Sequence, residues 1–452
     1  MTGFPLIIAF VIAVILMIVA ISKFKVHPFL SIMGVSLLLA LVAGIPLTDI
    51  PNVIGAGFSG TFSSIGIVII LGAFIGSVLE ATGAALKLAD MVIKLVGKKN
   101  PELAIELMGW VVSIPVFCDS GFVILDPIRR ALVRRTGVSS VAMTVALSTG
   151  LYISHVFIPP TPGPIAAAST LGIGDNLLLV MGLGFLCSIF PLAAGLVYAK
   201  FIGKRVKSSD ETAVSGEVVK TYEELVAEYG KLPGGFNSLA PLVVPIVFMA
   251  LGTVKSMAGL TGAFADLLTF LGTPIIALTV GTIFAIAQLA TAKKMDKFYE
   301  LVNDTLKTVG PILFVTAAGG VLGKVISNTT MITYITENAP ALMKMGIFFP
   351  FLMAAILKTA QGSSTVAITT TAGIVAPMMA ELGLAAPVMA ALTVMAIGAG
   401  AMTVSHANDS YFWVVTNFGK MTPQQGYKTQ TILTLVMGLA SIIGIFLVSL
   451  FF

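Results

Sequence analysis

Two short polar clusters stand in an otherwise apolar chain. The first is CDSG at residues 118–121, and the second is GSST at residues 362–365, 244 residues later in register. A carboxylate, hydroxyls and glycines at a turn of the backbone can bind a proton, a cation or the polar groups of a small solute. The same offset aligns residues 72–80 with residues 316–324. A duplicated fold with polar residues at matching depths in both halves is the pattern of a secondary transporter.

The composition excludes a soluble globular protein. Of the 452 residues, 57% are hydrophobic and only 10% are charged, and the mean hydropathy is +1.02. Such a chain has too little polar surface to cover a globule, so it predicts a polytopic membrane protein built of helices. The stretch 4–21 is predicted to be a retained first helix rather than a cleaved signal peptide, because no basic residue precedes it.

Charge and cysteine content give no support for a nucleic-acid-binding protein or for a disulfide-rich one. The pI of about 9.1 comes from basic residues in short loops beside predicted spans. The positive-inside rule explains them more simply than nucleic-acid binding does. Cys118 and Cys187 both fall in apolar segments, where a disulfide framework has no purpose.

Hydropathy predicts two halves with the same order of elements. Single spans are expected near 4–22, 27–45, 63–81, 176–201, 238–254, 274–292, 308–326 and 429–451. The first repeat is residues 1–202, with a hairpin at about 103–133 and a broken helix at about 140–173. The second repeat is residues 238–452, with a hairpin at about 346–380 and a broken helix at about 385–417. Residues 203–237 form a charged, cytoplasmic linker between them.

The distribution of basic residues along the chain predicts its orientation in the membrane. If the amino terminus is outside and each hairpin enters and leaves on one face, most of the 26 lysines and arginines lie inside. An odd number of crossings in either broken region would scatter these charges over both faces. The two hairpins are therefore predicted to be re-entrant, both termini are predicted outside, and the two repeats have inverted topology.

Re-entrant hairpins matter because of their backbone groups. A hairpin that turns inside the bilayer leaves the ends of two half-helices unpaired at mid-depth. Amides at a half-helix amino terminus favour an anion, whereas carbonyls with hydroxyls favour a cation. The alternative is that the serines and threonines only cap the half-helices and pack in the turn.

Each hairpin precedes an interrupted span. Residues 159–164 hold four prolines, which cannot continue a helix, and residues 405–410 form a second polar break. Both breaks contain a Ser-His pair, which places His155 and His406 at corresponding positions, while His27 lies in an ordinary loop before Pro28. Either histidine could be a neutral imidazole bonded to a freed carbonyl, or could contact a ligand or a proton.

Three runs of residues resemble the gluconate permease family, and the resemblance covers essentially the whole chain. They are FCDSGFVIL at 117–125, PPTPGP at 159–164 and KTAQGSSTVA at 358–367. The resemblance implies membership of an ion-transporter superfamily of elevator-type carriers, which are dimers with a scaffold domain and a mobile transport domain. It also implies a small hydroxylated carboxylate as substrate, such as gluconate, another sugar acid, glycerate or D-serine, carried by proton symport.

The chain departs from that family at three positions. Gluconate-type members often have histidine where Thr161 stands, a glutamate-length carboxylate near Asp119 and arginine where Lys358 stands. A carboxylate, a cation and the turn residues remain, so a transporter is still expected. The departures leave the size and polarity of the substrate open.

Ionisable residues at mid-depth are costly, at about 2.5 to 3.5 kcal/mol each on insertion scales, and are therefore functional candidates. Asp119 is the first candidate for the coupling proton, with Asp409 second, and a structural ion pair is the alternative for Asp119. Lys358 is expected to meet the substrate carboxylate unless it extends to an interface. The predicted substrate-binding residues are Ser120, Gly121, His155, Thr161, Gly163, Lys358, Gln361, Gly362, Ser363, Ser364, Thr365, His406 and Asn408. The inner mouth of the first hairpin is expected to hold basic residues that set topology and could attract anions, and topology alone explains them. The cluster consists of Asp126 and Pro127 with Arg129, Arg130, Arg134 and Arg135.

Other classes of function have little support. The Gly-Lys pair at 323–324 is followed by Val325 rather than Ser or Thr, so no ATP-binding loop is present, and the chain has no His-Glu-x-x-His motif. No enzymatic activity, cofactor, metal or nucleic-acid partner is expected. The remaining alternatives are a sodium-coupled carboxylate carrier and a passive anion channel. The expected location is a bacterial inner membrane, with a homodimer as the expected assembly.

Overall fold

Helices build the described part of the chain. The computed structural model describes residues 2–88, 91, 100–209, 232–257, 261–331, 334, 344–406 and 409–452, and no strand occurs among them. Seven helical stretches within these ranges are long and apolar enough to cross a membrane. The prediction of an all-α, multi-pass membrane protein is confirmed.

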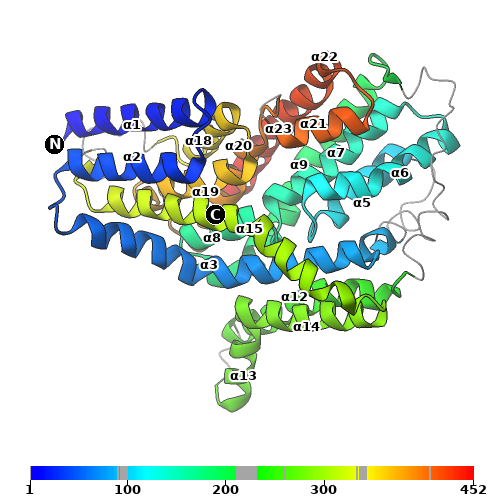
Figure 1. The fold of residues 1–452 in the computed structure, drawn as a ribbon, viewed down its shortest axis with the longest axis horizontal. Coiled ribbons are helices and arrows are strands. Elements are labelled where there is room, and N and C mark those ends of the chain that lie inside the picture. Colours follow the sequence, from blue (N-terminus) through cyan, green and yellow to red (C-terminus); the bar gives the residue numbers. More distant parts are fainter. Residues whose placement is uncertain are drawn as a thin grey trace.

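The helices of the first half include one that is much longer than a single span requires. Helix α3 has 32 residues, and Figure 1 shows it running from α1 and α2 at one end of the molecule towards α5 and α6 at the other. The bounds are α1 Phe4–Ser22, α2 Pro28–Ala43, α3 Ile50–Ala81, α5 Pro101–Val112, α6 Cys118–Thr136, α7 Ser140–Phe157, α8 Pro162–Thr170 and α9 Leu177–Ile202.

The second half contains the other very long helix. Offset by 244, α3 would occupy 294–325, and the 30-residue α15 occupies Phe298–Ser327. The bounds are α12 Gly235–Met257, α13 Ala263–Gly272, α14 Pro274–Thr291, α15 Phe298–Ser327, α18 Phe348–Gln361, α19 Ser364–Val375, α20 Pro387–Met402, α21 Ser410–Phe418, α22 Pro423–Gly426 and α23 Ile432–Ser449. A π-helical turn, Tyr427–Thr431, joins α22 to α23.

Four of these helices form two hairpins, and three of the four arms are short. Helix α5 has 12 residues, α18 has 14 and α19 has 12. At about 1.5 Å per residue, such arms are shorter than the roughly 30 Å hydrocarbon core of a bilayer. Helix α6 is longer, but it carries Asp126, Arg129 and Arg130. The turn of the second hairpin is Gly362, whose φ of 91° lies in the left-handed region that glycine adopts without strain.

Two further helices stop inside the protein at the predicted breaks. Helix α7 ends at Phe157, before Pro159 and Pro160, because a proline has no N–H to continue the helical hydrogen bonds. The chain restarts as α8, with Thr161 at its N-cap position. Helix α20 ends at Met402, and α21 begins after Asp409, whose side chain accepts a hydrogen bond from the backbone N–H of Tyr411.

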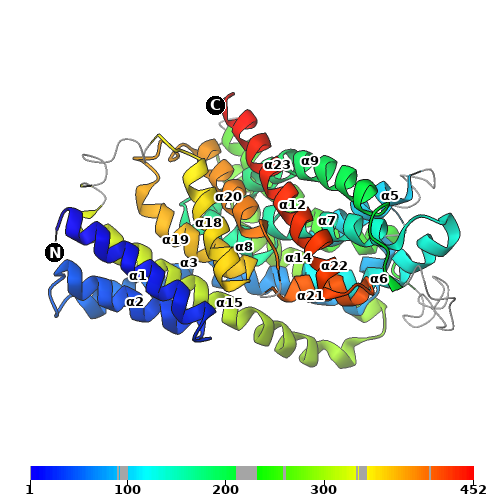
Figure 2. The same cartoon turned by 90° about the horizontal axis from the view of Figure 1, so that it is seen from above.

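The long helices support the turns and breaks by close backbone contact. Gly76 of α3 lies against the carbonyl of Pro115 in the turn of the first hairpin, so any side chain at this position would displace the turn. Gly319 of α15 faces the carbonyl of Thr369 in α19 in the same manner. Figure 2 shows α18, α19 and α20 side by side, next to α8. The hairpins therefore pack closely against the backbones of α3 and α15.

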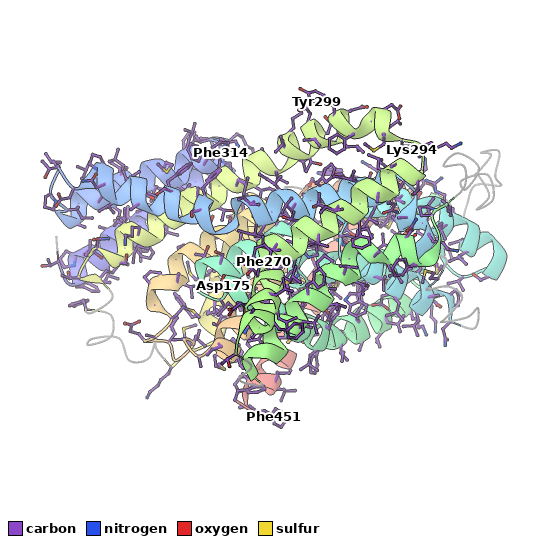
Figure 3. All side chains as sticks on the ribbon, turned by 90° about the horizontal axis from the view of Figure 1, so that it is seen from below. Asp175, Phe270, Lys294, Tyr299, Phe314 and Phe451 are labelled. Atoms are coloured by element: carbon purple, nitrogen blue, oxygen red, sulfur yellow. The ribbon has the colours of Figure 1, made fainter. Side chains whose placement is uncertain are left out.

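Large apolar side chains lie on the outer surface. Phe270 of α13 is 56% exposed and Phe451, near the carboxyl terminus, is 84% exposed. Figure 3 shows these two residues and Phe314 of α15 at separate places on the molecule. An apolar perimeter of this kind matches a surface that faces lipid tails rather than water.

Candidate functional site

A cavity of about 260 Å³ lies where the hairpins and the interrupted helices meet. Its polar side is formed by residues 117–119 of the first hairpin, His155 of α7, residues 363–366 of the second hairpin and residues 409–411 at the start of α21. The structure thus brings together segments that are up to 294 residues apart in the sequence. A concave site with a few converging polar groups is the usual form of a small-molecule site.

Three helices begin at this cavity. Helix α6 starts at Cys118, α19 at Ser364 and α21 at Ser410. The first amides of a helix have no intrahelical partner, and the helix dipole adds partial positive charge there, so each start attracts an anion. Some of these amides are already bonded by the chain itself. The Ser363 hydroxyl accepts from the N–H of Val366 at 3.3 Å, and the Asp409 carboxylate accepts from Tyr411 at 3.1 Å.

Asp409 and Lys358 form a buried ion pair beside the cavity. Lys358 Nζ lies 2.6 Å from Asp409 Oδ2, and the two side chains are 0% and 5% exposed. The same carboxylate oxygen accepts from Ser405 Oγ at 2.5 Å and from Tyr152 Oη at 3.4 Å. A buried ion pair needs such additional hydrogen bonds to offset the desolvation of its charges.

Lys358 contacts residues from three parts of the chain. Besides Asp409, its ammonium group donates to the carbonyl of Gly362 at the turn, and it lies 5.7 Å from the centre of the Tyr152 ring. The side chain is fully buried and does not extend to an interface. Asp409 lines the cavity, whereas Lys358 does not. A ligand in the cavity therefore meets the carboxylate of Asp409 before the ammonium group of Lys358.

Asp119 has different surroundings from Asp409. It lies in the first turn of α6 and lines the cavity, and its Oδ1 is buried without a hydrogen-bond partner among the described residues. His155 Nδ1 is likewise buried and unpartnered in the described chain, with its ring 6.0 Å from that of Phe117. An unpaired carboxyl oxygen and an unpaired imidazole nitrogen facing one cavity are available to a proton or to a ligand.

Glu106 of α5 is a second carboxyl without a hydrogen-bond partner in the described ranges. Both of its oxygens are buried and unbonded, and the residue has no exposed surface. It does not line the cavity. Asp119 is therefore the carboxyl that combines an unbonded oxygen with direct access to the cavity.

The predicted site residues separate into three groups. Those that line the cavity are Asp119, His155, Ser363, Ser364, Thr365 and Asp409. Those that lie near it in turns or helix ends are Ser120 in α6, Gly121 against Leu151, Thr161 at the start of α8, Gly163 against Ile368, Lys358, Gln361 as the last residue of α18, and Gly362. Asn408 lies outside the described residues.

The two histidines of the breaks have different contacts. His406 Nε2 donates a hydrogen bond, at 3.0 Å, to the carbonyl of Thr359 near the end of α18. This contact corresponds to the alternative in which the imidazole is bonded to a freed carbonyl. His155 lines the cavity instead. The Thr161 hydroxyl donates to the carbonyl of Ile158 at 2.7 Å, which makes it part of the break rather than part of the lining.

His27 is a lining residue that the sequence analysis assigned to an ordinary loop. It precedes α2, and together with Pro28 it borders the cavity opposite the hairpins. Local sequence shows only that a histidine before a proline can start a helix. His27 lines the cavity because α2 packs against α15. That packing is a tertiary contact, which local sequence does not predict.

A second cluster of buried charges ties α6 to α21. Arg129 Nε lies 2.6 Å from Asp126, and its guanidinium group also donates to Ser140 Oγ at 2.7 Å and to the carbonyl of Phe418 at 3.2 Å. Arg130 contributes a second ion pair with Asp126 at 2.7 Å. Topology alone does not account for Arg129, because its side chain has no exposed surface and binds the last carbonyl of α21.

Comparisons with known proteins identify relatives of the whole chain. The family model described as GntP family permease matches residues 5–451. An uncharacterized permease of Haemophilus influenzae is 34% identical over 92% of this chain and 86% of its own length. The low-affinity gluconate transporter of Escherichia coli K12 is 31% identical over 98% of both chains. The crystal structure of the Alcanivorax borkumensis YdaH transporter has a TM-score of 0.63 at 16% identity, covers 94% of this chain and 97% of its own, and shows similarity of fold alone.

Proposed function

Since the chain belongs to the GntP family of permeases, we propose that it imports a sugar acid or a related small hydroxylated carboxylate by proton symport. The observation that carries the proposal is the cavity at the starts of three helices, which combines the Lys358–Asp409 pair with Asp119, whose Oδ1 has no hydrogen-bond partner among the described residues. The similarity to a gluconate transporter of Escherichia coli supports the substrate class. We also propose a bacterial inner-membrane location with both termini outside.

Charge balance links the proton to the substrate. With both aspartates ionised, the two carboxylates and one lysine leave the site with one net negative charge, which opposes an incoming carboxylate. One proton on Asp119 removes that charge, so proton binding favours binding of the anion. Because binding free energies are reciprocal, the bound anion in turn favours the proton. Symport follows from this mutual dependence.

The two aspartates have separate roles in this proposal. Asp409 stays ionised because Lys358, Ser405 and the Tyr411 amide all bind it, while Asp119 exchanges the coupling proton. The substrate carboxylate binds among the helix starts, near residues 363–365. His155 and the hydroxyls of Ser363, Ser364 and Thr365 bind the substrate's hydroxyl groups. Gly121, Thr161, Gly163 and Gly362 shape the turns that expose them.

Alternating access is proposed to occur by an elevator movement. The hairpins and interrupted helices together form the transport domain, which moves against a scaffold that includes α2, α3 and α15. Contacts such as Gly76 with the Pro115 carbonyl support this division, because glycine leaves a smooth surface between the two bodies. The hairpins are re-entrant and the halves inverted in this arrangement, and two chains form a homodimer.

Uptake of labelled gluconate into proteoliposomes tests the function. An imposed pH gradient, acidic outside, is expected to drive accumulation above equilibrium, and a sodium gradient at equal pH is not. Accumulation driven by sodium alone would replace protons with sodium as the coupling ion. Equilibration without accumulation would indicate a channel. Failure to transport gluconate, idonate, glycerate or D-serine under any gradient would refute the substrate class.

A further inference from the structure

The cavity has one polar wall and one apolar wall. The polar wall comes from the hairpins and interrupted helices, as described above. A second wall comes from α2 and α15 and consists of Pro28, Pro311, Ile312 and Val315, together with His27, which precedes α2. His27 is thus the one polar side chain that the described chain contributes to this second wall. A substrate that spans the cavity meets apolar surface there everywhere except at the imidazole.

The hydrogen bonds of His27 determine which ring nitrogen faces a ligand. Nδ1 accepts from the backbone N–H of Phe29 at 3.3 Å, which caps the start of α2. A ring nitrogen that accepts a hydrogen bond carries no proton, so in the neutral imidazole the proton is on Nε2. Nε2 has no partner within the described ranges, and the side chain is exposed. The second wall therefore offers one N–H donor.

We propose that His27 is a specificity-determining residue whose Nε2–H donates to a hydroxyl of the bound sugar acid, distant from its carboxylate. This inference rests on the proposed function. The carboxylate is placed at the helix starts of the polar wall, so the hydroxylated chain extends towards α2 and α15. A donor that pairs with a substrate hydroxyl discriminates against an acid lacking that hydroxyl, because the donor is then left unpaired.

A role in capping α2 alone is the competing explanation, and one variant separates the two. Asparagine is among the best N-cap residues because its side-chain oxygen accepts the capping hydrogen bond, but it is shorter than histidine and its amide group does not extend to the position of Nε2. His27→Asn therefore keeps the cap and removes the donor from the cavity. His27→Ala removes both. Lys25→Asn is the matched control, because Lys25 lies in the same loop, has a φ of 56° that asparagine tolerates, and does not line the cavity.

The test is the affinity of the purified protein for D-gluconate and for its monodeoxy analogues at carbons 2 to 6. We expect His27→Asn and His27→Ala to weaken gluconate binding by about 3- to 10-fold, the loss of one neutral hydrogen bond, and Lys25→Asn to have no effect. We also expect one analogue to bind the wild type and His27→Asn equally, because it lacks the hydroxyl that His27 contacts.

Two results would overturn the inference while leaving the proposed function intact. One is wild-type gluconate affinity in His27→Asn with weaker binding only in His27→Ala, which would mean that His27 is a cap. The other is a loss on His27→Asn that is the same for gluconate and for every deoxy analogue. Absence of binding of any sugar acid to the wild type would refute the proposed function itself, and the inference with it.

Discussion

Asp119 and Asp409 border one cavity, yet the residues around them differ in kind. Asp409 has an ammonium group, a hydroxyl, a phenol and a backbone amide around it. Asp119 Oδ1 has no partner in the described part of the chain. Each bond to a carboxylate stabilises its ionised form, whereas burial without bonds stabilises the protonated form. This difference in surroundings is the basis for the proposal that Asp119, rather than Asp409, exchanges the coupling proton.

Replacing Asp119 with Asn separates coupling from transport. The amide keeps the size of the side chain and cannot release a proton, so gluconate accumulation under a pH gradient is expected to be lost. Exchange of labelled for unlabelled gluconate at equal concentrations should persist, since it needs no net proton movement. Both are measured in the same proteoliposomes. Full accumulation by Asp119→Asn would remove this residue from the coupling mechanism.

The Lys358–Asp409 pair is best tested as a pair. Lys358→Met or Asp409→Asn alone leaves an uncompensated buried group, which typically costs about 3–5 kcal/mol of stability. The double variant has no unpaired charge and is expected to recover a large part of that loss. Thermal unfolding in detergent measures all three variants against the wild type. Additive losses in the double variant would show that the two side chains do not stabilise each other.

At the scale of elements, Arg129 connects the two helices that present the aspartates. Helix α6 begins beside Asp119 and α21 begins after Asp409, and Arg129 binds the far end of α21 through the Phe418 carbonyl. Both helices start at the cavity and are joined again away from it. The relative position of the two carboxylates therefore depends on a side chain that does not touch the cavity.

Arg129→Lys is expected to weaken this connection. Lysine keeps the positive charge near Asp126 but cannot reproduce the forked contacts with both Ser140 and Phe418. A loss of about 2–3 kcal/mol in unfolding free energy is expected, together with weaker gluconate binding. Arg130→Lys is the matched control: Arg130 also donates to the Phe418 carbonyl, at 3.4 Å, but it is partly exposed at 18% and should lose much less. Equal effects of the two substitutions would contradict the special role of Arg129.

The elements could be predicted from sequence where local signals mark them. Prolines at 159 and 160 and the glycine at 362 stop helices α7 and α18 by their own backbone chemistry, so local sequence is sufficient to predict where these two helices end. Sequence did not predict that Lys358 pairs with Asp409 or that His27 lines the cavity. Each joins segments distant in sequence, and no local pattern states which helices pack together.

At the scale of the whole molecule, the cavity lies between two bodies that the proposed mechanism requires to move. Val366 of α19 lines it from the hairpin side and Val315 of α15 lines it from the opposite wall. If the hairpins move as a unit past α15, the distance between these two residues must change in every transport cycle. Ser148 of α7 and Gln430 beside α23 have side chains bonded at 2.8 Å, and they must keep their distance if α23 moves together with the hairpins and interrupted helices.

Cross-linking therefore distinguishes movement from a static pathway. In a background with Cys118 and Cys187 replaced by serine, Val315→Cys with Val366→Cys is expected to stop gluconate uptake when a short bifunctional thiol reagent joins them. Reductive cleavage of the linker should restore uptake. Ser148→Cys with Gln430→Cys, oxidised to a disulfide, is the control and should leave uptake unchanged. Unimpaired uptake by the linked Val315–Val366 variant would mean that α15 and α19 stay together throughout the cycle, which excludes an elevator movement at this surface.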